Sequence, residues 1–246
     1  MNELDGKRAL VTGGSRGIGA AIALTLAERG ADVALTYAQS ADRAAYIIRA
    51  IEANGRKALA IQADSADPAA LKRSVDAAAA ALGGLDILVN NAGICLNSPL
   101  AEASVEHIDT QFNINVRGPL LASQAALPHL GQGGRIVNIG SIGADRDFGD
   151  GLTVYYTTKA ALQAVTRGLA RELGQRDITV NLIQPGPTDT DMNPAHGEQA
   201  PGQRAMIPLG RYGEPRDVAE LVAFLAGPAA KQISGAIINV DGGLMA

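Results

Sequence analysis

The chain has 246 residues, of which 47% are hydrophobic and 19% charged, with a formal net charge of -4. This composition predicts a globular chain with a substantial core, and the acidic balance argues against non-specific nucleic-acid binding, which needs a basic surface. The single cysteine, Cys95, excludes an intramolecular disulfide. The polar N-terminus lacks the features of a signal peptide, and no apolar run approaches the roughly 20 residues of a membrane-spanning helix. We therefore expect a cytoplasmic protein with no membrane or nucleic-acid partner.

Short β-rich runs alternate with helical patterns along the whole chain. Predicted strands cover residues 8–12, 32–37, 58–62, 86–89, 135–139, 179–183 and 236–240. Predicted helices cover residues 18–29, 42–54, 68–82, 154–173 and 217–226, with further helical patterns before residue 130. Strands separated by helices imply parallel pairing, and strands that are apolar throughout imply helices on both faces of the sheet. The prediction is one α/β domain over residues 1–246, a doubly wound Rossmann domain with a parallel sheet of about seven strands.

The segment from residue 185 to 214 is rich in Gly and Pro and has no clear period. Its length, roughly thirty residues, is too great for a simple connection, and such loops usually serve as lids or binding loops. We predict a substrate loop at about 187–214. Its apolar residues suggest a partly apolar pocket; they are Met192, Met206, Ile207 and Leu209.

A glycine-rich loop, TGGSRGIG at residues 12–19, follows the first predicted strand and opens the first predicted helix. Glycines let the backbone turn sharply and approach a pyrophosphate, and the helix N-terminus offers free N–H groups to the anion. A tight strand–helix turn without a ligand is the alternative, and the position after the first strand favours dinucleotide binding. The candidate cofactor contacts in this loop are Gly13, Ser15, Arg16, Gly17, Ile18 and Gly19.

Cofactor choice is expected to be set at the end of the second predicted strand. An acidic residue there would bind the adenine ribose hydroxyls and repel a 2′-phosphate. The segment from Thr36 through Tyr37 to Ser40 has no carboxylate, and Arg16 offers positive charge. Both features favour NADPH/NADP+ over NADH, with a merely solvated Arg16 as the alternative.

Tyr155 and Lys159 are four residues apart at the start of a long predicted helix, so they share one face. The tyrosine pKa, near 10 in model peptides, is too high for acid–base work at neutral pH, and a lysine cation beside it favours the phenolate. Taken alone, so short a pattern is better explained by an ordinary exposed pair. Tyr156 is three residues from Lys159, which turns it away from the pair.

Further motifs strengthen the interpretation because they occur in order, each at a predicted strand end or on a helix. They are TGGSRGIG at 12–19, NNAG at 90–93, Asn115, Ser141, Tyr155 with Lys159, and Pro185-Gly186. With this set the chain resembles the short-chain dehydrogenase/reductase family over nearly its whole length. Several stretches look most like the 3-oxoacyl-carrier-protein reductase branch.

The resemblance implies a catalytic set of Asn115, Ser141, Tyr155 and Lys159. Tyr155 would give a proton to a carbonyl oxygen as hydride arrives from the nicotinamide, and Ser141 would donate a hydrogen bond to the same oxygen. Lys159 would lower the pKa of Tyr155 and bind the nicotinamide ribose. Asn115 would hold a water that passes protons from solvent to Lys159.

The resemblance also implies cofactor contacts outside the glycine-rich loop. Asp64 would bind the adenine amino group, and Tyr155 and Lys159 would contact the nicotinamide ribose region. The other expected contacts are Tyr37, Ser65, Asn91, Ala92, Gly93, Pro185, Gly186, Thr188 and Thr190. A homotetramer packed partly through the helices containing Asn115 and Lys159 is implied, with a dimer as the alternative.

Ser141 and Tyr155 are separated by one residue more than the commonest family spacing, and the intervening loop, residues 142–154, is rich in charge at Asp145, Arg146, Asp147 and Asp150. The longer loop leaves the catalytic assignment in place and affects the expected shape of the substrate pocket, which this loop lines. Cys95 is expected to pack as a small hydrophobe. The three histidines match no metal-ligand spacing, so no metal site is expected.

The best reading is an NADPH-dependent reductase that transfers hydride to a ketone or aldehyde, with the small-molecule carbonyl or alcohol substrate unassigned. Three alternatives stay open. The enzyme could oxidise an alcohol in vivo, it could be a 3-oxoacyl-carrier-protein reductase, or the chain could be a nucleotide-binding regulatory protein on the same fold. The complete set of Asn115, Ser141, Tyr155 and Lys159 weighs against the last, because a pure binder has no need of all four.

Overall fold

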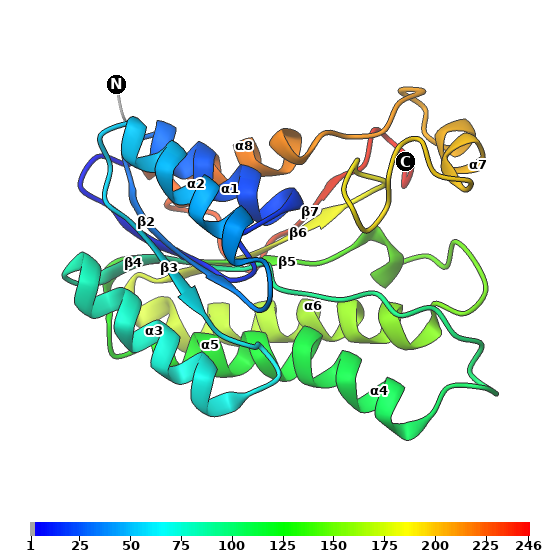
Figure 1. The fold of residues 1–246 in the computed structure, drawn as a ribbon, viewed down its shortest axis with the longest axis horizontal. Coiled ribbons are helices and arrows are strands. Elements are labelled where there is room, and N and C mark those ends of the chain that lie inside the picture. Colours follow the sequence, from blue (N-terminus) through cyan, green and yellow to red (C-terminus); the bar gives the residue numbers. More distant parts are fainter. Residues whose placement is uncertain (1–2) are drawn as a thin grey trace.

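Seven strands form one parallel sheet in the computed structural model, which describes residues 3–246 (Figure 1). The strands are β1 (Arg8–Val11), β2 (Asp32–Tyr37), β3 (Ala58–Gln62), β4 (Leu85–Asn90), β5 (Leu130–Ile139), β6 (Thr179–Pro185) and β7 (Ile237–Val240). Their order across the sheet is β3-β2-β1-β4-β5-β6-β7, and every neighbouring pair is parallel. The predicted doubly wound Rossmann fold is confirmed.

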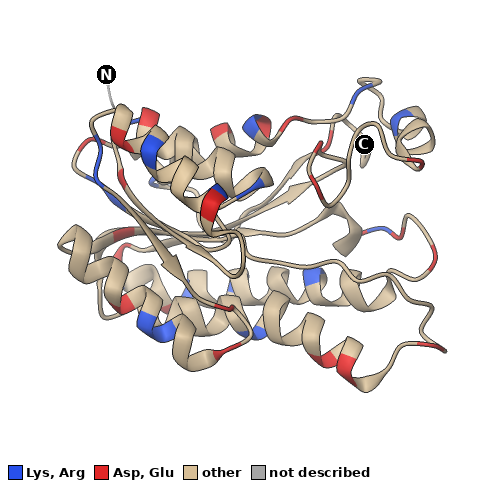
Figure 2. Cartoon of the chain, in the orientation of Figure 1, with Lys and Arg blue, Asp and Glu red and all other residues tan. Residues whose placement is uncertain are grey.

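Helices cover both faces of the sheet, as Figure 1 shows. One layer contains α1 (Gly17–Glu28), α2 (Ala41–Ala53) and α8 (Pro215–Ala226). The other contains α3 (Pro68–Leu82), α4 (Val105–Phe112), α5 (Gly118–Ala126) and α6 (Thr153–Leu173). Figure 2 shows that charged residues lie mainly on the helices and loops, whereas the inner strands carry few.

The central strand explains the two-layer core. Side chains alternate between the faces of a strand, and β1 follows this rule: Ala9 and Val11 join the cluster under α1 and α8, whereas Leu10 joins the cluster over α3 and α5. All three are fully buried. Because both faces must be apolar, β1 has no polar alternation, which is the pattern expected of an inner parallel strand.

The strand order reverses between β1 and β4, which are neighbours in the sheet. From β1 the chain adds β2 and β3 on one side, and from β4 it adds β5, β6 and β7 on the other. In open α/β sheets, the crevice outside the carboxyl ends of the strands at such a switch point is where ligands bind. The segments that leave β1, β4, β5 and β6 at this edge are the ones in which the sequence motifs lie. The topology therefore brings motifs from distant parts of the sequence to one place.

Several short elements were not predicted, among them one α-helix and one π-helical turn. A short helix, α7 (Ala200–Met206), lies within the segment expected to be irregular, where Pro201 and Gly202 obscure the helical pattern. A π-helical turn, Asn113–Arg117, joins α4 to α5. Among residues 3–246, no helix is both long and apolar enough to cross a membrane.

We predict that Gly19→Ala destabilises the protein. A Cβ at Gly19 would collide with the carbonyl oxygen of Gly13 and the side-chain nitrogen of Asn91. Forcing an extra carbon into such a packed site costs about 1–3 kcal/mol, which urea unfolding would measure.

Gly202→Ala is the matched control, since it adds the same methyl group to a helix where no described atom lies within 4 Å of the new carbon. This variant should match or slightly exceed the wild-type stability, because alanine favours helix. Equal stability of the two variants would contradict the packing argument.

Candidate active site

The glycine-rich loop between β1 and α1 packs too closely for side chains. Gly13 has φ +65° and Gly17 has φ +53°, the left-handed region that favours glycine. A Cβ on Gly13 would lie 2.9 Å from the Cα of Ala92, and one on Gly14 would lie 2.7 Å from the Cβ of Leu35. The loop is thus held against the ends of β2 and β4 by backbone contact.

The N-terminus of α1 is arranged to receive an anion. Arg16 occupies the N-cap position in extended conformation, and within the described chain no side chain caps this helix end; its first turn contains no acidic residue. The contrast is α3, where the Asp67 carboxylate accepts from the N–H groups of Ala69 and Ala70 at 2.8 and 3.1 Å. Uncapped N–H groups and the positive end of the helix dipole fit a pyrophosphate.

Asn91 holds the glycine-rich loop in place. Its side-chain nitrogen donates to the carbonyl oxygens of Thr12 and Gly13, both at 3.0 Å. In return, the Thr12 hydroxyl oxygen accepts from the backbone N–H groups of Asn91 at 3.0 Å and Ala92 at 3.1 Å. Asn91 was predicted to line the cofactor; the structure shows its side chain bonded to the loop that the cofactor would contact.

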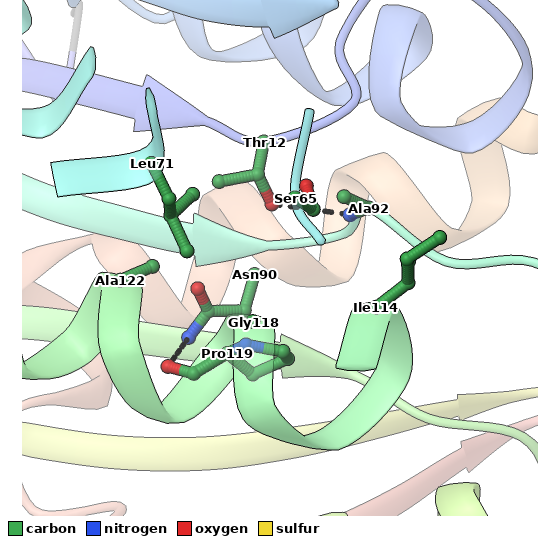
Figure 3. Close-up of a pocket in the computed structure, with 9 residues that line it drawn as sticks. All are labelled: Thr12, Ser65, Leu71, Asn90, Ala92, Ile114, Gly118, Pro119 and Ala122. Atoms are coloured by element: carbon green, nitrogen blue, oxygen red, sulfur yellow. Dashed lines mark hydrogen bonds between the residues drawn. The ribbon is translucent and has the colours of Figure 1, made fainter. Parts of the chain in front are cut away.

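The residues expected to bind the adenosine part of a dinucleotide lie at the ends of β2 and β3. Tyr37 ends β2, and Asp64 and Ser65 follow β3. The carboxylate of exposed Asp64 accepts from the Ala66 N–H at 2.9 Å. Figure 3 shows a small enclosed pocket nearby, formed by Thr12, Ser65, Leu71, Asn90, Ala92, Ile114, Gly118, Pro119 and Ala122. Of the residues expected at this end, Ser65 lines this pocket.

Arg43, in the first turn of α2, was missed by the sequence reasoning. Its guanidinium binds the carboxylate of Asp191, whose oxygen also lies 3.6 Å from Nη1 of Arg16. The signal was a second basic residue shortly after the end of β2. The glycine-rich loop therefore has a second cation, Arg43, beside the predicted Arg16.

The segment after β6 covers the opposite end of the crevice. Gly186 donates to the Val240 carbonyl at 2.9 Å, and a Cβ on it would lie 2.8 Å from the Cα of Asp241. The Thr188 hydroxyl donates to the Gly186 carbonyl at 3.0 Å. The methyl of Thr190 lies 3.4 Å from where a Gly17 Cβ would stand. The substrate loop thus begins by crossing the glycine-rich loop.

Ser141, Tyr155 and Lys159 come together between β5 and α6. Ser141 follows β5, and its hydroxyl oxygen accepts from the Gly143 N–H at 3.1 Å, which begins a 3-10 turn. Lys159 is buried, and its Nζ donates to the Ile139 carbonyl at 3.1 Å. The same Nζ lies 5.7 Å from the ring centroid of Tyr155. The arrangement places a phenol, a hydroxyl and an ammonium group around one point.

Asn115 is fully buried in the π-helical turn. Its side chain exchanges two hydrogen bonds with the backbone of Ile94, at 2.9 and 2.8 Å, and donates to the Thr158 hydroxyl at 3.0 Å. Its Oδ1 and the Nζ of Lys159 each lie 3.3 Å from the Cβ position of Gly93. Asn115 therefore ties the NNAG segment to α6, and the water it was expected to hold stays a prediction.

Burial dominates the ionisation of the site. It raises the pKa of Tyr155 well above its usual value, while the adjacent Ser141 acts in the opposite direction. Burial lowers the pKa of Lys159 to about 8. The lower Tyr155 pKa expected from Lys159 is thus not found in this structure, because removal of the phenolate from water outweighs its neighbours.

Tyr156 has a different environment from Tyr155. Its ring packs over Gly143, where a Cβ would collide with it, and its centroid lies 5.6 Å from that of Tyr155. Burial and nearby Asp147 raise its pKa to about 12. Tyr156 therefore shapes the wall behind Ser141.

Asp145 fixes the loop whose shape the sequence left open. Its carboxylate accepts from the side-chain amides of Gln163 and Gln184, both at 2.6 Å. Gln163 lies one turn beyond Lys159 on α6, and fully buried Gln184 precedes Pro185. The Ser141 loop is thus bonded to the helix and to the strand that border the site.

The side of the crevice next to the predicted substrate loop is apolar. Ile142, Ala200, Ile207, Tyr212 and Leu244 form a buried cluster, with Phe148, Ala195 and Met245 packed against it. This cluster joins the Ser141 loop, the substrate loop and the C-terminal residues.

Cys95 borders the site and is partly exposed, and burial raises the pKa of its thiol. In the part of the chain that the structure describes, no three His, Cys, Asp or Glu side chains are grouped as metal ligands.

This fold and site are those of a nucleotide-binding oxidoreductase, and comparison with known proteins agrees. A family model described as enoyl-(acyl carrier protein) reductase matches residues 13–245. A short-chain dehydrogenase from Burkholderia cenocepacia, solved in complex with NADP, is 56% identical, with a TM-score of 0.98 over 99% of this chain and 100% of that one. The chain belongs to the short-chain dehydrogenase/reductase family.

Two curated relatives correspond to the alternatives that the sequence left open. The cyclic-di-GMP-binding biofilm dispersal mediator protein of Escherichia coli is 43% identical over 98% of each chain. The 3-oxoacyl-[acyl-carrier-protein] reductase of Staphylococcus aureus is 40% identical over 97% of this chain and 98% of its own. The expected likeness to the carrier-protein reductases is therefore confirmed.

We predict that Lys159→Met stabilises the folded protein at pH 7. The pKa of Lys159 falls from 10.5 in the unfolded chain to about 8 in the folded one. At pH 7 both states carry the proton, and holding the cation in the interior costs about 3 kcal/mol. Between pH 8 and 10.5 the unfolded chain binds more protons, so wild-type stability rises with pH.

Urea unfolding of both proteins at pH 7 and pH 9.5 tests this. The stability advantage of the variant should shrink as the pH rises, and Tyr155, present in both, cancels in the comparison. A difference that is independent of pH would contradict the assignment of the cost to a buried cation.

Proposed function

We propose that the protein is an NADPH-dependent reductase of ketones or aldehydes, running reversible alcohol dehydrogenase chemistry. The observation that carries this is the meeting of Ser141, Tyr155 and Lys159 beside an uncapped helix N-terminus. A site that only bound phosphate would need the helix N-terminus but none of these three side chains. Hydroxyl donors next to a buried ammonium group suit a carbonyl oxygen that gains negative charge.

The choice of NADPH rests on charge. No carboxylate stands between Thr36 and Ser40, where one would repel a 2′-phosphate, and Arg16 and Arg43 supply positive charge nearby. The Burkholderia relative that binds NADP has the same fold throughout. We expect the remaining cofactor contacts named above to lie along the bound dinucleotide.

Bound NADPH would supply the hydride, and the protein would supply the proton. Tyr155 has a raised pKa, so it holds its proton until a stronger base appears. An alkoxide forming on the substrate is such a base, and Ser141 would donate a hydrogen bond to the same oxygen. Lys159 has a pKa of about 8 and would act in its protonated form at neutral pH, offsetting the charge left on the phenolate.

Asn115 would serve proton return. Its side-chain oxygen and Nζ of Lys159 both face Gly93, which leaves them on one side of the NNAG segment. A water bound between them would pass protons to Lys159 as the phenolate of Tyr155 is restored. The side chain's bonds to Ile94 and Thr158 would hold it in place during this relay.

The apolar cluster beneath the substrate loop favours a small organic carbonyl over a highly charged one.

We also propose a homotetramer. Its contacts would use the α4–α5 helix, where Val105, Phe112 and Leu120 are exposed, together with α6.

A nucleotide-binding regulator is the second candidate, favoured by the name of the Escherichia coli relative. Its weakness is that regulation does not require Tyr155 beside Lys159.

Tyr155→Phe should lower kcat by about 10²–10⁴-fold, because the proton donor is lost. Tyr156→Phe removes the same atom from the neighbouring ring and should retain most activity, since that ring faces Gly143. Steady-state reduction of a reactive ketone measures both. Near-normal turnover by Tyr155→Phe would contradict the assignment of Tyr155 as the proton donor.

Turnover should be more efficient with NADPH, with kcat/KM for NADH lower by about tenfold or more, since one charged hydrogen bond contributes that much. The assay follows nicotinamide absorbance with small ketones, bulky ketones and acyl thioesters. A preference for acyl thioesters would favour the carrier-protein branch. Tight NADPH binding without turnover on any substrate would favour the regulator.

A further inference from the structure

Three separate segments border an open groove next to the glycine-rich loop. Ser15, Arg16 and Gly17 come from that loop, Asp42 and Arg43 from the first turn of α2, and Asp191 from the substrate loop. The groove therefore joins the phosphate end of the site to the loop that covers the nicotinamide end.

Asp191 connects the two arginines in this groove. One oxygen of its carboxylate is bound by the Arg43 guanidinium and lies 3.6 Å from Nη1 of Arg16. All three side chains are about half exposed. The hydrogen bond from Arg43 and the charge of Arg16 hold the pKa of Asp191 below its usual range, so it is an anion at neutral pH.

Two cations that converge on one anionic oxygen form a binding arrangement for a phosphate. Exposed ion pairs between single charges contribute little, because water screens them. A phosphate monoester carries nearly two charges and three acceptor oxygens, and guanidinium groups bind such oxygens in pairs. A phosphate that reaches this groove should therefore displace the carboxylate.

We propose that Asp191 occupies the place of the 2′-phosphate of NADPH and competes with it for Arg16 and Arg43. This inference rests on the proposed function, and it makes Arg43 a specificity residue. Asp191 directly follows Thr190, which crosses the glycine-rich loop at Gly17. Binding of NADPH then frees the substrate loop from α2, whereas NADH leaves the link intact.

The test is isothermal titration calorimetry of NADPH and NADH with the full chain, since the protein has no tryptophan to report binding. Arg43→Gln should raise the Kd for NADPH about tenfold, through loss of a charged hydrogen bond, and leave that for NADH unchanged. Asp191→Asn should lower the Kd for NADPH about threefold and again leave NADH unchanged. In the double variant, the gain from Asp191→Asn should shrink, because its main partner is gone.

Arg49→Gln and Glu52→Gln are the matched controls. They make the same charge changes on exposed positions of α2 outside the groove, and they should leave both Kd values unchanged. If the controls change the Kd for NADPH as much as the groove variants do, the overall charge of the protein explains the result and the proposal is overturned.

Two further results would also overturn it. If Asp191→Asn weakens NADPH binding, the carboxylate positions the arginines and does not compete. If Arg43→Gln changes NADPH and NADH equally, the groove does not receive the 2′-phosphate. Failure of the wild type to bind either nucleotide would instead remove the proposed function itself, and the inference with it.

Discussion

The close contact between the glycine-rich loop and Asn91 is the constraint on which the site depends. The absence of a Cβ at Gly13 and Gly19 lets the β1–α1 turn approach the NNAG segment, and Asn91 then binds two carbonyl oxygens of that turn. The same segment, at Ile94, is held by Asn115, which is bonded to α6. The proposed phosphate-binding loop and the proposed proton-transfer residues are therefore joined by one chain of hydrogen bonds.

The proposed catalytic chemistry and the stability of the fold place opposite demands on the centre of this site. Lys159 and Tyr155 are both held away from water, and burial shifts each pKa toward its neutral form. The protein retains an interior ammonium group whose desolvation is offset by few contacts, among them the Ile139 carbonyl. The apolar layers on both faces of the sheet must supply the stability that this arrangement consumes.

The sequence predicts the fold well because its inner strands are apolar without alternation and its helices are long and periodic. The parallel topology then locates the motifs, since strand ends of one kind lie at one edge. Other features depend on tertiary contacts that no local pattern contains. The roles of Asp145 and Arg43 come from partners far away in the chain, and α7 is concealed by Pro201 and Gly202. The pKa of Tyr155 is raised and not lowered as expected, because burial depends on the folded structure and cannot be seen in the spacing of Tyr155 and Lys159.

The C-terminal residues have a practical importance that their position in the sequence does not suggest. Leu244 is buried in the apolar cluster beneath the predicted substrate loop, and Met245 packs against it, so both residues help to build the apolar wall on that side of the crevice. A tag or a reporter domain fused directly after these residues should accordingly disturb the packing of this cluster.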